Sequence, residues 1–256
     1  MSEATRAWRT VLEKIEADLL DGRLGPGDRL PSERDLSAAL GVGRSSVREA
    51  LRVLEVMGLI RTGTGSGPHA GAIITATPRG GLSAVLRLQV AAHGFPLDDV
   101  VATRLVLETA VVDAVAAAVA ATPHAGTSRA TSDARVVLDA MERDDLTPGE
   151  FLALDAQLHL ALAEASGNQV IAATMMGLRT AIESYVRAGA ERIPDWDATS
   201  ARLRAEHRAL LDAVDAGDAA LARALVHAHI TGYYAEAGLA RPSSRATSTR
   251  TSRETN

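Results

Sequence analysis

The sequence predicts a mostly α-helical protein made of two domains, and three observations support this prediction. Hydrophobic residues make up 46% of the 256 residues but aromatic residues only 3%, so the core must consist of Ala, Leu and Val, which suits closely packed helices. Apolar residues recur at helical spacing along most of the chain. Patterns typical of β-strands occur only in one short stretch before residue 76.

Residues 1–76 are expected to form three helices followed by a hairpin. Ser32 is placed to cap the second helix, with Asp35 three residues later in a capping-box arrangement, and Gly58 closes the third helix. A glycine-rich loop separates two short apolar runs. The expected elements are helices at 9–21, 33–40 and 44–57 and strands at 59–62 and 72–75. This order of elements is that of a winged helix-turn-helix.

The rest of the chain is predicted to be an all-helical domain at 82–238, reached through a linker at 77–81. Breaks rich in Gly and Pro divide it into about seven helices. These are expected at 82–93, 97–121, 127–143, 148–166, 168–188, 197–216 and 218–237. The tail at 239–256 consists of Ser, Thr and Arg with little to bury, so we expect it to be disordered.

Composition excludes several classes of protein. The absence of cysteine rules out disulfides and thiolate metal sites. The chain has no apolar run as long as a signal peptide or a membrane span needs, which indicates a cytoplasmic protein with no membrane partner. The net charge is −5, and residues 1–76 carry ten basic and ten acidic side chains. Contacts with DNA must therefore come from charges concentrated on one face.

The start of the third helix carries such a concentration. Arg44 and Arg48 lie one turn apart and away from the apolar side of that helix, so they can reach guanine edges in a major groove. Ser45 and Ser46 are placed to reach phosphates, and Arg34 can approach the same groove. The alternative is that these arginines form an ordinary solvated face.

Four polar residues are predicted to point into the core of the second domain. Asp155 and His159 share one side of a helix, in the middle of its apolar arc, and His207 and His229 project among leucines on two further helices. A buried carboxylate is costly unless it is compensated. An aspartate with three imidazoles suits a divalent transition metal, with Zn favoured over Ni or Mn. A purely hydrogen-bonded cluster is the alternative.

Arg104 and Glu108 also project inward, beside apolar positions of their own helix. An arginine next to a metal site would hold the carboxylate of an effector. Arg179 is a second candidate for this role. The alternative is an internal pair of Arg104 with Glu108 and no ligand.

The first segment resembles the GntR family of regulators. The resemblance covers residues 8–76 and rests on the runs at 30–36, 41–51 and 58–60. It implies a homodimer on palindromic double-stranded DNA, with the recognition helices in adjacent major grooves. One departure is Gly43, where the family usually has Ser or Thr. By motif match, the DNA-contacting positions are Arg34, Arg44, Ser45, Ser46, Arg48 and Gly65.

Residues 82–237 are similar to the FadR-type ligand-binding domain, often called FCD, in its seven-helix form. The resemblance implies that Asp155, His159, His207 and His229 bind a metal. We therefore expect a ligand-responsive regulator, by default a repressor, that senses a small organic acid. Two alternatives stay open: a metal-dependent hydrolase, and a regulator whose metal is purely structural. Against the hydrolase, Glu206 is expected to project away from the site, so that no inward general base is evident.

Overall fold

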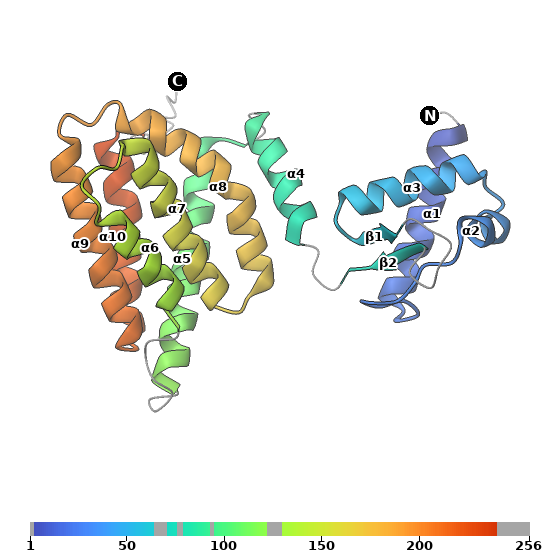
Figure 1. The fold of residues 1–256 in the computed structure, drawn as a ribbon, viewed down its shortest axis with the longest axis horizontal. Coiled ribbons are helices and arrows are strands. Elements are labelled where there is room, and N and C mark those ends of the chain that lie inside the picture. Colours follow the sequence, from blue (N-terminus) through green and yellow to red (C-terminus); the bar gives the residue numbers. More distant parts are fainter. Residues whose placement is uncertain (1–2, 64–70, 76–78, 93–94, 122–129, 240–256) are drawn as a thin grey trace, which may run out of the picture.

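A computed structural model of the chain describes residues 3–63, 71–75, 79–92, 95–121 and 130–239. Figure 1 shows a small N-terminal domain and a larger helical domain, with helix α4 between them. The mostly helical fold with an N-terminal winged helix-turn-helix is therefore confirmed. None of the helices in the described ranges is long and apolar enough to cross a membrane.

The N-terminal domain packs three helices against a two-stranded antiparallel sheet, in which Ile60 pairs with Ile74. Its apolar core includes Val11, Ile15 and Val47. The Ser32 hydroxyl caps the second helix by accepting from the Asp35 amide. The elements are α1 (Glu3–Leu20), α2 (Glu33–Leu40), α3 (Arg44–Val56), β1 (Ile60–Gly63) and β2 (Gly71–Ile74).

A feature that the sequence did not predict extends this sheet. Arg29 forms an isolated antiparallel bridge with Ile73, and the Leu30 amide donates to the Ala72 carbonyl at 2.9 Å. The segment before α2 thus fastens the hairpin to the body of the domain, although its turn-forming residues gave no strand signal.

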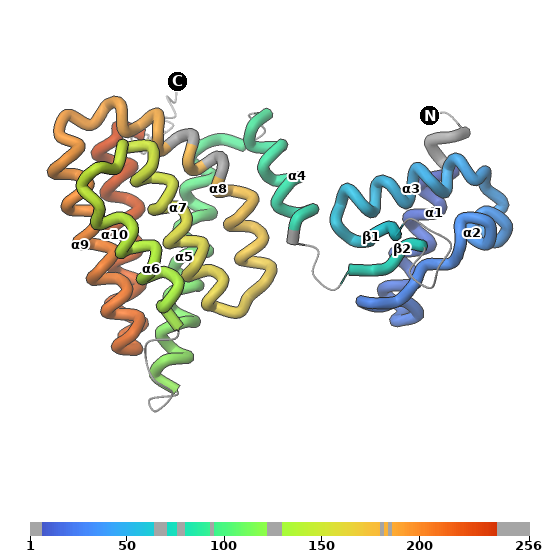
Figure 2. Tube along the Cα trace, viewed as in Figure 1, coloured from blue at the N-terminus to red at the C-terminus, as the bar shows by residue number. Residues whose placement is uncertain are grey.

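The helical domain surrounds one large core that includes Phe151, Leu158, Leu203 and Leu211. Figure 2 shows α5 running among α7, α8 and α10, with α9 at the far side from the N-terminal domain. The helices are α4 (Arg79–Ala91), α5 (Leu97–Ala121), α6 (Ser132–Met141), α7 (Pro148–Ala165), α8 (Gln169–Ala190), α9 (Trp196–Asp215) and α10 (Ala219–Glu236).

These bounds follow the predicted helices closely because glycine, proline and capping residues mark them. Thr147 and Glu150 form a reciprocal capping box at the start of α7, and Pro148 occupies its first turn. One correction concerns the linker: helix α4 begins at Arg79, so that only part of the segment 77–81 connects the domains. The expected start of α6 near 127 lies outside the described residues, as does the expected disordered tail at 239–256 apart from its first residue.

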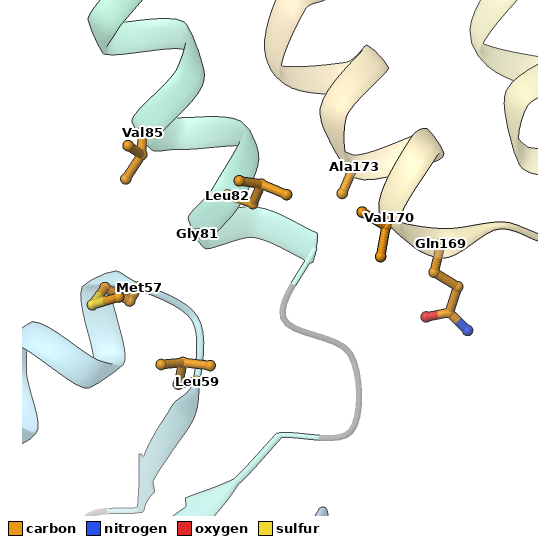
Figure 3. A pocket seen from close by; sticks show the side chains of 8 residues that line it. All are labelled: Met57, Leu59, Gly81, Leu82, Val85, Gln169, Val170 and Ala173. Carbon is orange, nitrogen blue, oxygen red and sulfur yellow. The ribbon is translucent and has the colours of Figure 1, made fainter. Parts of the chain in front are cut away.

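The two domains meet at α4. A Cβ placed on Gly81 would lie 1.6 Å from the Met57 carbonyl oxygen, so the end of α3 and the start of α4 are in direct backbone contact. Beside this contact is a cavity of about 470 Å³ lined mainly by apolar side chains, among them Leu59, Leu82 and Val170 (Figure 3). Helix α4 also packs on α8, where the Ser83 hydroxyl donates to the Ala173 carbonyl at 2.9 Å.

Candidate functional site

The predicted DNA-contacting arginines lie on the exposed side of α2 and α3. Val47, Ala50 and Leu51 of α3 are buried in the domain core, whereas Arg44 and Arg48 are exposed. This arrangement follows from the helical period, because residues four apart share a side. Ser45 is exposed and Ser46 half-buried at the first turn of the same helix. Gly65, predicted to contact DNA from the wing, lies outside the described residues.

Two of these arginines have acidic neighbours. Arg48 Nε lies 2.9 Å from Glu33 Oε2, with side-chain exposures of 60% and 42%. Arg34 Nε lies 3.5 Å from Asp35 Oδ1 and its side chain is 78% exposed. Such exposed pairs are weak and screened by salt. The guanidinium groups are therefore available to phosphates or bases at small cost.

The second predicted site is a cluster of buried polar residues in the middle of the helical domain. Four helices supply it, and every member is at most 5% exposed. It consists of Arg104 and Glu108 from α5, Asp155 and His159 from α7, His207 from α9 and His229 from α10.

Four ligand atoms of this cluster converge on one point. Asp155 and the three histidines each offer one atom, and these atoms all lie within 4.8 Å of one another. His159 Nε2 is 3.2 Å from His229 Nε2. Asp155 Oδ1 is 3.1 Å from His207 Nε2, and it lies 3.6 Å and 3.9 Å from the Nε2 atoms of His229 and His159.

The outer nitrogens of two of the histidines face carboxylates. His159 Nδ1 lies 2.5 Å from Glu108 Oε2, and His229 Nδ1 lies 2.9 Å from Glu206 Oε2. A neutral imidazole carries one proton, and the Glu206 carboxylate, which is hydrogen-bonded to His229, holds that proton on Nδ1 of His229. His159 Nδ1 and Glu108 Oε2 are close to each other but are not aligned for a hydrogen bond. With the proton of each imidazole on Nδ1, the two Nε2 atoms present bare lone pairs to each other and to the Asp155 carboxylate. This arrangement is repulsive unless a cation or an additional proton lies among these atoms.

Electrostatics of the cluster favour an ionised aspartate and neutral imidazole at His207. Burial by itself would raise the pKa of Asp155, but hydrogen bonding from His207 and His229 outweighs it and holds that pKa well below its usual range. Burial lowers the pKa of His207 to about 4. The pKa of Glu108 falls to about 2, because the charges of Arg104 and His159 outweigh the effect of its burial. Burial alone would lower the pKa of His229, but its hydrogen bonds to Asp155 and Glu206 outweigh burial and raise that pKa, so the net charge of this buried site depends on the protonation of His229.

Arg104 completes the cluster next to the convergent atoms. Its Nε donates to Glu108 Oε1 at 2.5 Å, and its Nη2 lies 3.9 Å from Asp155 Oδ2. Both Arg104 and Glu108 are buried, so the predicted inward orientation of the pair is confirmed. The contacts of Glu108 connect it to Arg104 and His159, which makes it a positioning residue for the histidine as well as a partner of the arginine.

Arg179, the second candidate for holding an effector, occupies a different environment. Its Nε donates to Glu183 Oε1 at 2.6 Å, its side chain is 33% exposed, and it lines a surface cavity with Gln157 and Glu164. No contact among the described residues joins Arg179 to the buried cluster, so the geometry gives its predicted role no support.

Sequence reasoning missed two residues of this region. Glu206 was expected to project away, yet its carboxylate reaches His229 on the neighbouring helix, because a long side chain can turn toward a helix packed alongside. Tyr234 was not singled out, yet it is buried and its charge interactions are with Arg104, Glu108 and Asp155. The helical projection of α10 held a weak signal for Tyr234, since it shares a side with the buried Ile230.

Comparison with known proteins assigns a family to each of the two domains. Residues 8–69 match the bacterial regulatory proteins of the gntR family, and residues 99–232 match the FCD domain. The regulator LutR of Bacillus subtilis (strain 168) is 31% identical, over 84% of this chain and 97% of the relative. The Glc operon transcriptional activator of Escherichia coli (strain K12) is 30% identical, over 80% and 78% of the two chains.

A further relative from Escherichia coli (strain K12), named as an L-lactate dehydrogenase operon regulatory protein, is 29% identical over 86% of this chain and 82% of its own length. Among solved structures, Streptococcus agalactiae GntR has a TM-score of 0.54 at 21% identity and covers 87% of this chain and 96% of its own. That likeness confirms the fold.

These matches decide between the classes of function that the sequence left open. The relatives are transcription regulators, so the hydrolase alternative is not favoured. The buried cluster lies inside the part of the chain that matches the FCD domain, and its Asp and His residues are able to hold a metal ion. The chain belongs to the GntR family of bacterial transcription regulators, with a DNA-binding winged helix-turn-helix and an effector-binding FCD domain.

Proposed function

We propose that this regulator binds a divalent transition metal at Asp155, His159, His207 and His229, and that a small organic acid sensed there changes its affinity for operator DNA. The observation that carries the proposal is the convergence of three Nε2 atoms and one carboxylate oxygen. The outer Nδ1 atom of His229 is hydrogen-bonded to Glu206, and that of His159 lies beside Glu108. Metal-binding histidines characteristically donate their other ring N–H to a carboxylate.

The spacing of these atoms supports a metal over a purely hydrogen-bonded cluster. Ligands that each lie about 2.0–2.1 Å from zinc are about 3.3 Å apart at tetrahedral angles. The separations of 3.1–3.9 Å between Asp155 Oδ1 and the three Nε2 atoms surround that value. Nitrogen and oxygen ligands favour Zn, with Ni or Mn as the next choices. A metal would act on the effector as a Lewis acid, while the protein supplies the donors.

The effector is proposed to be a small carboxylic acid held by Arg104. Binding of a divalent cation by Asp155 would draw this carboxylate away from the Arg104 Nη2 group, which lies 3.9 Å from Asp155 Oδ2, so that the guanidinium can face a ligand. The name of one relative concerns an L-lactate dehydrogenase operon. A screen should therefore begin with small hydroxy acids and dicarboxylic acids.

For the DNA-binding domain, the proposal is a homodimer that places Arg44 and Arg48 against base edges and Ser45 and Ser46 against phosphates, with Arg34 close to the same groove. The exposed positions of Arg44 and Arg48 on one side of α3 support it. Gly65 keeps its predicted contact by motif match alone. Repression relieved by the effector is the expected sign, although a relative is named as an activator, so the assay must report the direction.

The metal is tested by elemental analysis of the purified protein, with two variants for comparison. We expect about one metal ion per chain in the wild type and none in a variant that combines His159→Ala with His207→Ala. The control is His227→Ala, because His227 is an exposed histidine on α10, two residues from His229. Absence of metal from the wild type after purification and after metal addition would refute the proposal.

DNA binding and sensing are tested with duplexes selected from a random pool by the purified protein. We expect Arg48→Ala to weaken binding at the selected site by about 5- to 150-fold, corresponding to about 1–3 kcal/mol for one guanine contact. The metal has a purely structural role if chelation lowers the melting temperature while no carboxylic acid changes DNA affinity.

A further inference from the structure

A chain of hydrogen bonds runs from the buried cluster toward the surface where α9 packs on α10. Its inner end is His229, whose Nδ1 lies 2.9 Å from Glu206 Oε2. Arg202 Nη1 donates to Glu206 Oε1 at 2.5 Å, and Arg202 Nη2 donates to Glu236 Oε2. The Thr199 hydroxyl donates to Glu236 Oε1 at 2.6 Å. The side chains of Thr199, Arg202, Glu206 and Glu236 are called the α9–α10 seam below.

Each carboxylate of the α9–α10 seam divides its two oxygens between two partners. Glu206 directs Oε1 to Arg202 and Oε2 to His229. Glu236 likewise directs one oxygen to Arg202 and the other to Thr199. A glutamate side chain in solvent samples several rotamers, and restricting it to one costs conformational entropy. Because the guanidinium holds Oε1 of Glu206, the other oxygen stays directed at the imidazole.

The seam reaches the one histidine of the cluster whose outer nitrogen has a hydrogen-bonded partner among the described residues. The Nδ1 of His159 is close to Glu108 without being aligned for a hydrogen bond, and the Nδ1 of His207 has no partner in the described part of the chain. An imidazole binds a metal through Nε2 when its proton is on Nδ1, and the hydrogen bond at Nδ1 determines this tautomer. Glu206 therefore prepares His229 as a ligand.

The exposure of the seam makes its effect on the metal separable from its effect on folding. The side chains of Arg202, Glu206 and Glu236 are 36%, 27% and 35% exposed. Ion pairs in contact with water contribute little to stability. Removing the guanidinium of Arg202 should therefore leave the helical domain folded, while it frees the Glu206 carboxylate to turn away from His229.

We propose that Arg202, supported by Glu236, is a positioning residue of the metal site. It holds Glu206 in the orientation that keeps the proton of His229 on Nδ1 and leaves Nε2 free for the cation. This inference rests on the metal site of the proposed function. Loss of an outer partner of a metal-binding histidine typically weakens metal binding by about 10- to 100-fold. Arg202 acts through Glu206, so its own effect should be smaller.

The experiment measures the affinity of the full-length protein for zinc by competition with a chromophoric chelator. The variants are Arg202→Met, Glu206→Ala and the double variant that combines them. The matched control is Arg135→Met. Arg135 is also 36% exposed and also pairs with two carboxylates, those of Asp212 and Asp215 on α9. Neither of these aspartates contacts a histidine of the cluster among the described residues.

The expected results form a double-mutant cycle. Glu206→Ala should weaken zinc binding by about 10- to 100-fold and Arg202→Met by about 3- to 10-fold. Arg135→Met should keep the wild-type affinity within about 2-fold, and the double variant should bind zinc as Glu206→Ala does. Each single variant should lower the melting temperature of the zinc-free protein by less than about 4 °C.

The outcomes separate this inference from the proposed function. A wild type that binds no zinc overturns the proposed metal site and this inference with it. Zinc binding by the wild type that Arg202→Met leaves unchanged, or weakens no more than Arg135→Met does, overturns the role of Arg202 alone. A double variant that binds zinc more weakly than Glu206→Ala also overturns it, because Arg202 would then act by a route other than Glu206.

Discussion

Replacing Glu108 by Gln tests whether burial makes the Arg104–Glu108 pair essential to the helical domain. Glutamine keeps the shape of the side chain and one acceptor oxygen, so the substitution removes mainly the charge. Arg104 and Glu108 are 4% and 3% exposed in their side chains, and Arg104 then keeps only Asp155, at 3.9 Å, as a counter-ion. Breaking a buried ion pair by removing one partner costs about 3–5 kcal/mol.

The chain contains a matched control with the same chemistry and a different environment. Arg179 and Glu183 are also an Arg–Glu pair four residues apart on a helix, with an Nε–Oε1 distance of 2.6 Å, but their side chains are 33% and 26% exposed. Helical pairs in contact with water contribute about 0.3–0.5 kcal/mol. Glu183→Gln therefore changes the charge of the protein equally and should cost little.

The assay is thermal unfolding of the helical domain, followed by circular dichroism in a chelator so that metal does not contribute. For a domain of 150–250 residues, 1 kcal/mol shifts the melting temperature by about 2–4 °C. We expect Glu108→Gln to lower it by about 6–20 °C and Glu183→Gln by less than about 2 °C. Equal shifts in the two variants would show that burial of the Arg104–Glu108 pair has no special cost, and the interpretation of the cluster would be wrong.

Three further changes test other parts of the structure. Glu33→Gln removes the carboxylate 2.9 Å from Arg48. Because exposed ion pairs contribute up to about 1 kcal/mol, the substitution should raise DNA affinity by about 2- to 5-fold. Fluorescence anisotropy measures the affinity for DNA, and weaker binding by the variant would contradict the prediction. Thr147→Ala removes the cap of α7 and should cost about 1 kcal/mol in chemical denaturation, whereas an unchanged midpoint would mean that the cap is redundant. Gly81→Ala places a methyl group 1.6 Å from the Met57 carbonyl oxygen. The substitution should alter DNA affinity and leave the unfolding of the helical domain unchanged. An unchanged DNA affinity would show that the contact between the domains is unimportant.

Much of the fold was predictable because local signals agree with the tertiary structure. The helices of the second domain begin and end within a few residues of the predicted bounds, since proline, glycine and caps such as Thr147 determine them. The start of α4 at Arg79 was missed because two glycines at positions 80 and 81 disfavour a helix locally. Contact with Met57 requires the glycine at position 81, so its presence reflects packing between the domains.

The members of the buried cluster were predictable, but its hydrogen-bond partners were not. A polar residue within an apolar helical face is visible in the sequence, and this identified Asp155, His159, His207 and His229. Which carboxylate faces which imidazole depends on how α9 and α10 pack. Glu206 is adjacent to His207 and was expected to point elsewhere, yet it reaches the histidine of the other helix at 2.9 Å. Periodicity gives the direction of a side chain from its own helix and not its reach toward a neighbour.

The packing of α4 and α8 gives a physical route by which the cluster can influence the DNA-binding domain. Helix α7, which carries Asp155 and His159, packs on α8, and α8 packs on α4. A Cβ on Gly177 of α8 would lie 2.8 Å from the Leu86 side chain and 3.0 Å from the Ser83 Cα of α4, so the backbone of α8 lies directly against α4 at this point. The same is true of Gly81 against Met57 at the end of α3. Such close contacts transmit a displacement because neither backbone has space to absorb it. We therefore expect a ligand that draws α5 and α7 together around Arg104 and the metal site to shift α4, and a shift of α4 changes the position of the recognition helix.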